Sequence, residues 1–453
     1  MKRKIYQRLL EWKSNEAKNC ALLIDGARRV GKSYIAEEFA RNEYKAYLLV
    51  NFAKAPLSVK RLFSDYQEKL DVLFLKLLGH YGVRLPERES LVIFDEVQEC
   101  PKARESIKHL VADGRYDYLE TGSLVSINEN VEDIVIPSEE ERVKLFPMDF
   151  EEFLWAKGDE LTMDLIRQHY VRKEALGPLL HRKAMDLFRQ YLIVGGMPQA
   201  VAEFVRSADL ESVDRMKRRI LRLYRQDIEK HAGRYALKTK LVFDGLAAQL
   251  SRHEKKFCVS ALKKGGRMRE YEDAFMWLTE AMVVNVCYRS TEPNVGLGLN
   301  AERSTMKCYV HDTGLLVSLA FTEAQLVAEQ IHRRLLFDAL EINKGMLVEN
   351  VVAQMLTAAG FDLFFFSTSE ESARADRMEI DFLVPRLSLG RRHNIRPIEV
   401  KSSRKYDHTS LDKFMGKFKS FLTDPLVLHS KDVKLENGVT YLPLYMTPLI
   451  ASC

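Results

Sequence analysis

Short apolar runs alternate with helical patterns through the first third of the chain. Residues 21–24, 47–50 and 91–94 are apolar throughout, and residues 34–41 follow the first run with a helical pattern. Short continuous apolar runs of this kind are typical of strands that are buried on both faces. We therefore predict an α/β domain built on a parallel sheet.

The pattern becomes helical after residue 149. Leu, Phe and Ile recur at helical spacing to about residue 233, interrupted by Gly195-Gly196-Met197-Pro198. Gly and Pro end regular structure, so this segment predicts a turn between two helices. Residues 241–289 predict short helices followed by a strand, an order that resembles a winged helix. Asp312 or Thr313 is expected to cap the helix that follows it.

Apolar alternation returns near the end of the chain. A helix is expected over 343–357, and strands over 361–367, 378–384 and 396–401. This order predicts a second α/β region.

A glycine-bracketed loop follows the first apolar run and precedes a helix. In such a loop the glycines let the backbone wrap, and the backbone N–H groups and the helix N-terminus bind phosphate. Its lysine would approach the β- and γ-phosphates, and its serine hydroxyl is the expected Mg²⁺ ligand. An ordinary turn is the alternative. The residues predicted to contact the nucleotide are Gly26, Ala27, Arg28, Arg29, Val30, Gly31, Lys32 and Ser33.

Two carboxylates end the apolar run at 91–94. Asp95 is predicted to hold Mg²⁺, and Glu96 to polarise the attacking water. The alternative is a helix N-cap with an acid in the first turn. The position after a buried strand, in the same α/β unit as Lys32, favours catalysis.

The next expected strand, 116–123, ends in small polar residues. Thr121 and Ser123 are candidates for sensing the γ-phosphate, with a turn-forming role as the alternative. Arg142 is a candidate arginine finger, contacting phosphate in its own chain or a neighbouring one. Pairing with the surface acids at 138–141 is its alternative.

The C-terminal region carries a carboxylate pattern. Glu349 lies in a helix, Asp381 in one strand, and Glu399 and Lys401 in the next. Asp381 and Glu399 could hold Mg²⁺ for phosphodiester cleavage, with Glu349 as a further ligand through water and the lysine orienting water or neutralising charge. An exposed sheet face with a Glu–Lys pair is the alternative.

These motifs together resemble an AAA+-type ATPase family of bacteria and archaea. Members carry a C-terminal domain of unknown function that is similar to PD-(D/E)XK nucleases. Two departures are visible: Glu141-Arg142 stands where the family usually has Gly-Arg, and Thr121-Gly122-Ser123 replaces a longer serine run. The segments that carry the resemblance are 26–33, 91–96, 120–123, 145–153, 191–198 and 311–315, together with the pattern after 340.

Composition adds little to this picture. The net charge of +5 allows nucleic acid as a partner without arguing for it, and basic stretches at 215–225 and 386–419 could be either phosphate contacts or solvated faces. Scattered cysteines without a Cys-x-x-Cys pair, and no signal peptide or membrane span, lead us to expect a cytoplasmic protein.

We expect an α/β multidomain fold. Its parts are a P-loop AAA+-like core with a parallel sheet (1–150), a helical lid (151–235), a winged-helix-like module (236–305) and a PD-(D/E)XK nuclease-like α/β domain (306–453).

The leading functional hypothesis is an ATP-binding and ATP-hydrolysing protein that acts on nucleic acid, with metal-dependent nuclease activity in the C-terminal domain. One alternative is a nucleotide-dependent switch for a protein partner, in which that domain only docks. Another is a winged-helix DNA-binding regulator. The expected cofactors are ATP and Mg²⁺. The candidate partners are DNA or RNA, another protein and a second copy of the chain, but not a membrane.

Overall fold

The computed structural model describes residues 1–123, 137–252, 256–294, 296–321, 344–368, 376–386, 394–403 and 407–452. The chain divides into two compact units, Met1–Phe146 and Pro147–Cys453. The predicted boundary at residue 150 lies close to this division.

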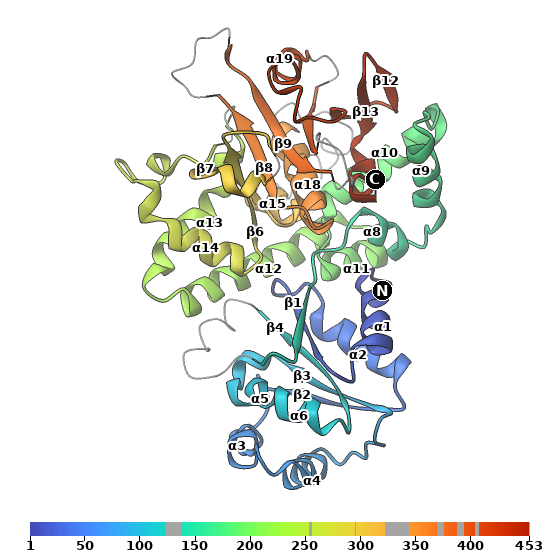
Figure 1. The fold of residues 1–453 in the computed structure, drawn as a ribbon, viewed down its shortest axis with the longest axis vertical. Coiled ribbons are helices and arrows are strands. Elements are labelled where there is room, and N and C mark those ends of the chain that lie inside the picture. The colour runs from blue at the N-terminus through green and yellow to red at the C-terminus, as the bar shows by residue number, and fades with distance from the viewer. Residues whose placement is uncertain are drawn as a thin grey trace. The chain divides into compact units, whose positions relative to one another are not determined.

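The first unit contains a parallel sheet, as predicted. In its described part the strand order is β2-β3-β4-β1-β5, and every pair is parallel (Figure 1). The strands are β1 (Ala21–Asp25), β2 (Ala46–Asn51), β3 (Ser90–Asp95), β4 (Asp117–Gly122) and β5 (Glu140–Lys144). The helices are α1 (Ile5–Asn15), α2 (Lys32–Glu43), α3 (Leu57–Asp65), α4 (Leu70–Tyr81), η1 (Val97–Glu99), α5 (Pro101–Glu105) and α6 (Ile107–Asp113).

Helices cover both faces of this sheet (Figure 1). Leu22 and Ile24 pack into one apolar cluster with α1 and α2, and Ala21 and Leu23 pack into a second with α3, α4 and α6. Burial on both faces explains why the strands are continuous apolar runs. The carboxyl end of β1 lies between those of β4 and β5, at the edge of an open α/β sheet where ligands bind.

The second unit begins with helices. They are α8 (Phe150–Ala156), α9 (Leu161–Arg172), α10 (Pro178–Val194), α11 (Pro198–Ser207), α12 (Leu210–His231), η2 (Gly233–Tyr235), α13 (Ala236–Leu250), η3 (Val259–Ala261), η4 (Met268–Glu270) and α14 (Glu272–Glu280). The predicted turn at 195–197 separates α10 from α11. The lid role expected for 151–235 stays a prediction.

A mixed sheet follows, with the order β12-β13-β11-β10-β9-β8-β6-β7 in the described residues (Figure 1). The strands are β6 (Val284–Ser290), β7 (Ala301–Val310), β8 (Leu363–Ser367), β9 (Glu379–Pro385), β10 (Ile395–Val400), β11 (Leu426–His429), β12 (Lys434–Glu436) and β13 (Val439–Pro443). The remaining helices are η5 (Leu297–Asn300), α15 (Thr313–Ala320), α18 (Lys344–Ala358), α19 (Thr409–Phe418) and η7 (Leu444–Ser452).

The mixed sheet corrects the predicted boundary at 305/306, which falls inside β7. β6 pairs with β7 on one side and, in parallel, with β8 on the other. The physical reason is that strand backbones need partners, and β8 supplies one to β6 from beyond the expected boundary. Residues 284–310 therefore belong to the C-terminal sheet and do not form part of a separate winged-helix-like module.

Glycine backbones meet at a buried junction in the second unit. The Asp312 carboxylate accepts from the Gly196 N–H at 2.5 Å and, as the predicted cap of α15, from the Leu315 N–H at 2.8 Å. Lys217 donates to the carbonyl oxygens of Ile193 (2.7 Å) and Gly314 (3.1 Å). The two glycine-containing segments singled out by the sequence thus form one packed structure.

We expect Gly314→Ala to destabilise the second unit by about 2 kcal/mol or more, because the new Cβ would lie 2.4 Å from the Val194 carbonyl oxygen. A thermal unfolding midpoint, followed by circular dichroism, measures this. Gly416→Ala is the control: it lies in α19 with nothing within 4 Å of the new Cβ, so we expect no loss of stability. Equal midpoints for the two variants would contradict the tight junction.

Candidate nucleotide-binding site and C-terminal carboxylates

The loop between β1 and α2 has the backbone that the glycine pattern predicts. Gly31 has φ 103° and Arg29 has φ 70°, both in the left-handed region. A Cβ at Gly26 would lie 2.5 Å from the Leu145 carbonyl oxygen, so a larger residue does not fit there. The Arg28 and Arg29 side chains are exposed.

Lys32, the first residue of α2, is buried inside this loop. Its Nζ donates to the carbonyl oxygens of Gly26 at 2.8 Å and Ala27 at 3.2 Å. Burial lowers the pKa of Lys32. Nearby carboxylates, Glu96 above all, attract the ammonium group and oppose this shift. The loop therefore holds an ammonium group at the position where its backbone would meet a phosphate.

Asp95 is the centre of a hydrogen-bond group at the carboxyl edge of the sheet. The hydroxyls of Ser33 and Thr121 both donate to its Oδ1, each at 2.6 Å. The Asn51 side-chain amide donates to Oδ2 at 2.5 Å. Residues from α2, β2, β3 and β4 thus converge on one carboxylate. Asn51 was missed from the sequence, although its place at the end of a buried strand is a usable signal.

Glu96 adopts a backbone conformation that is unusual for a residue with a side chain. Its φ of 54° and ψ of 52° lie in the left-handed region, which costs on the order of 1 kcal/mol. The Glu96 N–H donates to the Thr121 hydroxyl at 3.2 Å, and its carboxylate accepts from Gln98 at 2.6 Å. Although Glu96 precedes η1, its side chain makes no capping hydrogen bond, so the N-cap alternative does not describe it.

Arg142 lies elsewhere on the sheet. It pairs with Leu23 in the register of β1 and β5, and its Nε lies 3.0 Å from Glu140 Oε1. Arg104 binds the same carboxylate through two bonds, at 2.7 and 2.8 Å. Burial acts to raise the pKa of Glu140, but the ion pair with Arg104 outweighs it and holds the pKa of Glu140 below its ordinary value. Burial, together with the nearby Glu140 carboxylate, raises the pKa of Glu120. Among the described contacts Arg142 is not brought to the Asp95 group, and its finger role stays a prediction.

The predicted metal ligands of the C-terminal region each bond to a protein donor. Asp381 Oδ2 accepts from the Val400 N–H at 2.8 Å. Lys401 donates to Glu399 at 2.7 Å, and the Tyr309 hydroxyl donates to Glu349 at 3.0 Å. Within the described ranges, no group of three or more His, Cys, Asp or Glu side chains is placed to hold a metal ion.

Lys307 of β7 also reaches Asp381, together with the neighbouring Glu379, and was missed from the sequence. Its Nζ lies 2.8 Å from Glu379 Oε1 and 3.5 Å from Asp381 Oδ1. Burial alone would lower the pKa of Lys307, but Glu349, Glu379 and Asp381 raise it well above the ordinary value. No sequence signal identifies Lys307, since it lies 74 positions before Asp381 (381 − 307).

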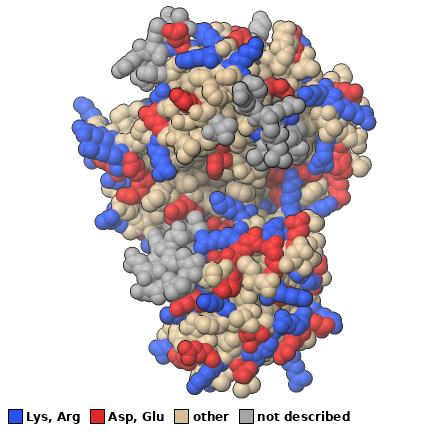
Figure 2. All heavy atoms as spheres, viewed as in Figure 1, with Lys and Arg blue, Asp and Glu red and all other residues tan. Residues whose placement is uncertain are grey.

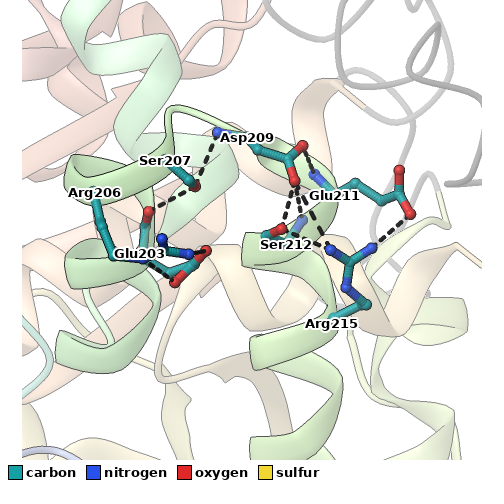
Figure 3. A network of polar contacts seen from close by, with 7 residues as sticks. All are labelled: Glu203, Arg206, Ser207, Asp209, Glu211, Ser212 and Arg215. Carbon is teal, nitrogen blue, oxygen red and sulfur yellow. Dashed lines mark hydrogen bonds and ion pairs between the residues drawn. The ribbon is translucent and has the colours of Figure 1, made fainter.

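The basic stretch at 215–225 is largely charge-paired. Figure 3 shows Asp209 accepting at the start of α12 and Arg215 turned toward Glu211. Lys217 is buried at the glycine junction. The ion pairs of this stretch are Arg215–Glu211, Arg218–Asp214 and Arg225–Asp244. This pairing favours the solvated-face alternative.

The surface drawn in Figure 2 also mixes charges, with Asp and Glu among the Lys and Arg side chains. Several members of the second basic stretch lie outside the described residues, namely Arg391, Arg392, His393, Arg404 and Lys405. Among the helices that are described, none combines the length and apolar character needed to cross a membrane.

Parts of the chain match known protein domains. Residues 18–154 match the AAA domain. Residues 185–326 match a domain of unknown function (DUF8612), and residues 344–446 match another (DUF4143). A search of curated proteins finds no match. The AAA domain contains every residue predicted to contact nucleotide. Neither of the other two matches describes a nuclease.

Solved structures show distant similarity. The Walker-type ATPase PABY2304 of Pyrococcus abyssi is 14% identical, covering 71% of this chain and 96% of its own, with a TM-score of 0.40. Cdc6p of Pyrobaculum aerophilum is 12% identical over 74% of this chain and 94% of its own, with a TM-score of 0.26. The signal transduction ATPase PH0952 of Pyrococcus horikoshii is 12% identical over 78% and 48%, with a TM-score of 0.28. Scores this low do not by themselves establish a shared fold.

If the residues at this edge of the sheet hydrolyse ATP, Asn51→Ala should lower the rate roughly tenfold, because Asp95 loses a donor worth about 1–2 kcal/mol in orienting it. A phosphate-release assay with Mg²⁺ measures this. Asn19→Ala, at an exposed turn residue of the same unit, is the control and should keep wild-type activity. If Asn51→Ala hydrolyses ATP at the wild-type rate, Asp95 does not need the hydrogen bond from Asn51 to be oriented.

Proposed function

We propose that this protein is an ATPase whose AAA domain binds ATP with Mg²⁺ and hydrolyses it. The observation that carries the proposal is the convergence of Ser33, Thr121 and Asn51 on Asp95, beside a loop that buries Lys32. The AAA domain match supports ATPase activity at the general level.

The residues present suit a magnesium nucleotide. Hydroxyl and carboxylate oxygens are ligands that Mg²⁺ prefers, and Ser33 and Asp95 already lie within hydrogen-bond distance of each other. These two would hold the ion, which would offset charge on the phosphates when bound. Residues 26–32 would hold the phosphates through the loop backbone and the Lys32 ammonium.

Glu96 is the proposed general base. A carboxylate within reach of water at the sheet edge can accept its proton, a role typically worth 10²–10⁴-fold in rate. Its left-handed backbone and its bond to Gln98 fix the direction of the side chain. Thr121 bonds both Asp95 and the Glu96 N–H, so we propose that it couples the metal ligand to the base.

The nuclease and nucleic-acid roles rest on the sequence pattern. Asp381, Glu399 and Glu349 are each held by a donor of the protein, two of them in the vicinity of a lysine ammonium, which supports the alternative in which this region does not cleave nucleic acid. An arginine supplied by a second copy of the chain stays part of the proposal, as does assembly itself.

The roles of Lys32 and Glu96 are separable by substitution. We expect Lys32→Ala to lose ATP binding, measured with a fluorescent ATP analogue. Glu96→Gln should bind ATP but hydrolyse it at least about 100-fold more slowly, because the amide accepts no proton. Glu99→Gln, an exposed neighbour, is the matched control. Unchanged turnover in Glu96→Gln would rule out its role as base.

Nucleic-acid action is tested by binding of labelled single- and double-stranded DNA and RNA at about 0.15 M salt, with ATPase activity measured in the same preparation. We expect ATPase activity without tight oligonucleotide binding, because the basic stretch at 215–225 is largely charge-paired. Tight, salt-dependent binding would restore the nucleic-acid hypothesis over the docking alternative.

A further inference from the structure

The ammonium group of Lys307 lies among acidic side chains in the interior of the second unit. Lys307 comes from β7, and its side chain is 1% exposed. The acidic residues come from β9 and α18, which lie far from β7 in the sequence. We call Glu349, Glu379 and Asp381 the carboxylate cluster.

The members of the cluster engage Lys307 in different ways. Glu379 Oε1 lies 2.8 Å from Nζ and Asp381 Oδ1 lies 3.5 Å from it. Glu349 attracts the ammonium electrostatically while its Oε2 accepts from Tyr309. The ring of Phe365 covers Nζ at 5.1 Å from its centroid, so an apolar face closes one side of the group.

We infer that Lys307 is the resident cation of the carboxylate cluster and stands beside Asp381, one of the carboxylates to which the sequence pattern assigns Mg²⁺. Glu349 is buried and the Asp381 side chain is 15% exposed, whereas the Glu379 side chain is 39% exposed. Carboxylates that are largely removed from water need a compensating positive charge, which a metal ion or an ammonium group can supply. Here the protein itself supplies this positive charge, as the ammonium group of Lys307 on β7.

A metal ion does not fit while Lys307 is in place. A divalent ion on Asp381 would stand close to the buried ammonium, and the repulsion between the two positive charges opposes metal binding there. The second oxygen of Asp381 already accepts from Val400 N, and Glu399 is bound by Lys401. The Phe365 ring offers no oxygen ligand. This inference concerns the second unit and does not depend on ATP binding by the AAA domain.

The inference assigns the C-terminal sheet a role other than metal-dependent cleavage. Lys307 joins β7 to β9 across the two strands between them, β6 and β8. The Lys307–Glu379 ion pair therefore links two strands of the sheet. An active nuclease would instead keep an open metal position in this region.

The test is Mn²⁺ binding to the full chain without nucleotide, measured by electron paramagnetic resonance and by the thermal midpoint. Lys307→Met removes the ammonium and keeps the length of the side chain. We expect this variant to gain one Mn²⁺ site made by the Asp381 and Glu379 carboxylates with water, because no three acidic side chains among the described residues are placed to hold a metal ion, and to be stabilised by Mn²⁺. The double variant Lys307→Met, Asp381→Asn should lose that site. Lys434→Met, which removes an exposed ion pair with Glu436, is the matched control and should gain nothing.

Two outcomes would overturn the inference. One is a Mn²⁺ site in the wild-type protein that Asp381→Asn abolishes. The other is a folded Lys307→Met variant that gains no Mn²⁺ binding. If Lys307→Met does not fold alone, refolding with Mn²⁺ should restore it, and failure to do so would also count against the inference. ATP turnover in the same samples reports separately on the AAA domain.

Discussion

A carboxylate that is buried away from water keeps its charge only where donors surround it, and those donors must come from segments that fold together. Asp95 draws α2, β2 and β4 to the end of β3. Asp312 draws the turn after α10 to the start of α15, and Asp381 draws β7 and β10 to β9. In each case one acidic side chain fixes the relation of elements that are distant in sequence.

The chemical kind of donor separates these carboxylates. Hydroxyl and amide groups surround Asp95, and neutral donors such as these can yield to a metal ion without charge repulsion. Backbone N–H groups hold Asp312 inside a packed junction, where a Cβ on the approaching glycines would clash. A fixed ammonium faces Asp381. Acidic residues that look alike in the sequence thus have three different roles, which only their neighbours reveal.

The sequence pattern predicts local features well. The parallel sheet, the phosphate loop, the turn at 195–197 and the cap at Asp312 follow from nearby residues, because glycine, proline and apolar spacing act over short distances. Asn51 and Lys307 were missed because their partners lie 44 and 74 positions away (95 − 51 and 381 − 307). The boundary at 305/306 was wrong for the same reason: the pairing of β6 with β8 is set by three-dimensional contact and leaves no local signal.

The pairing of β6 with β8 also affects the order in which the protein can form during synthesis. The first unit has all its described strands once Lys144 has been made. In the second unit, β6 and β7 are made before their partners. Until β8 to β10 leave the ribosome, β6 lacks its neighbour β8 and Lys307 lacks its ion-pair partner Glu379. While the intervening residues are being translated, the emerging chain therefore carries the β6–β7 hairpin with the β6 edge unpaired. Such an edge is a natural substrate for chaperones and a point where neighbouring nascent chains can pair wrongly.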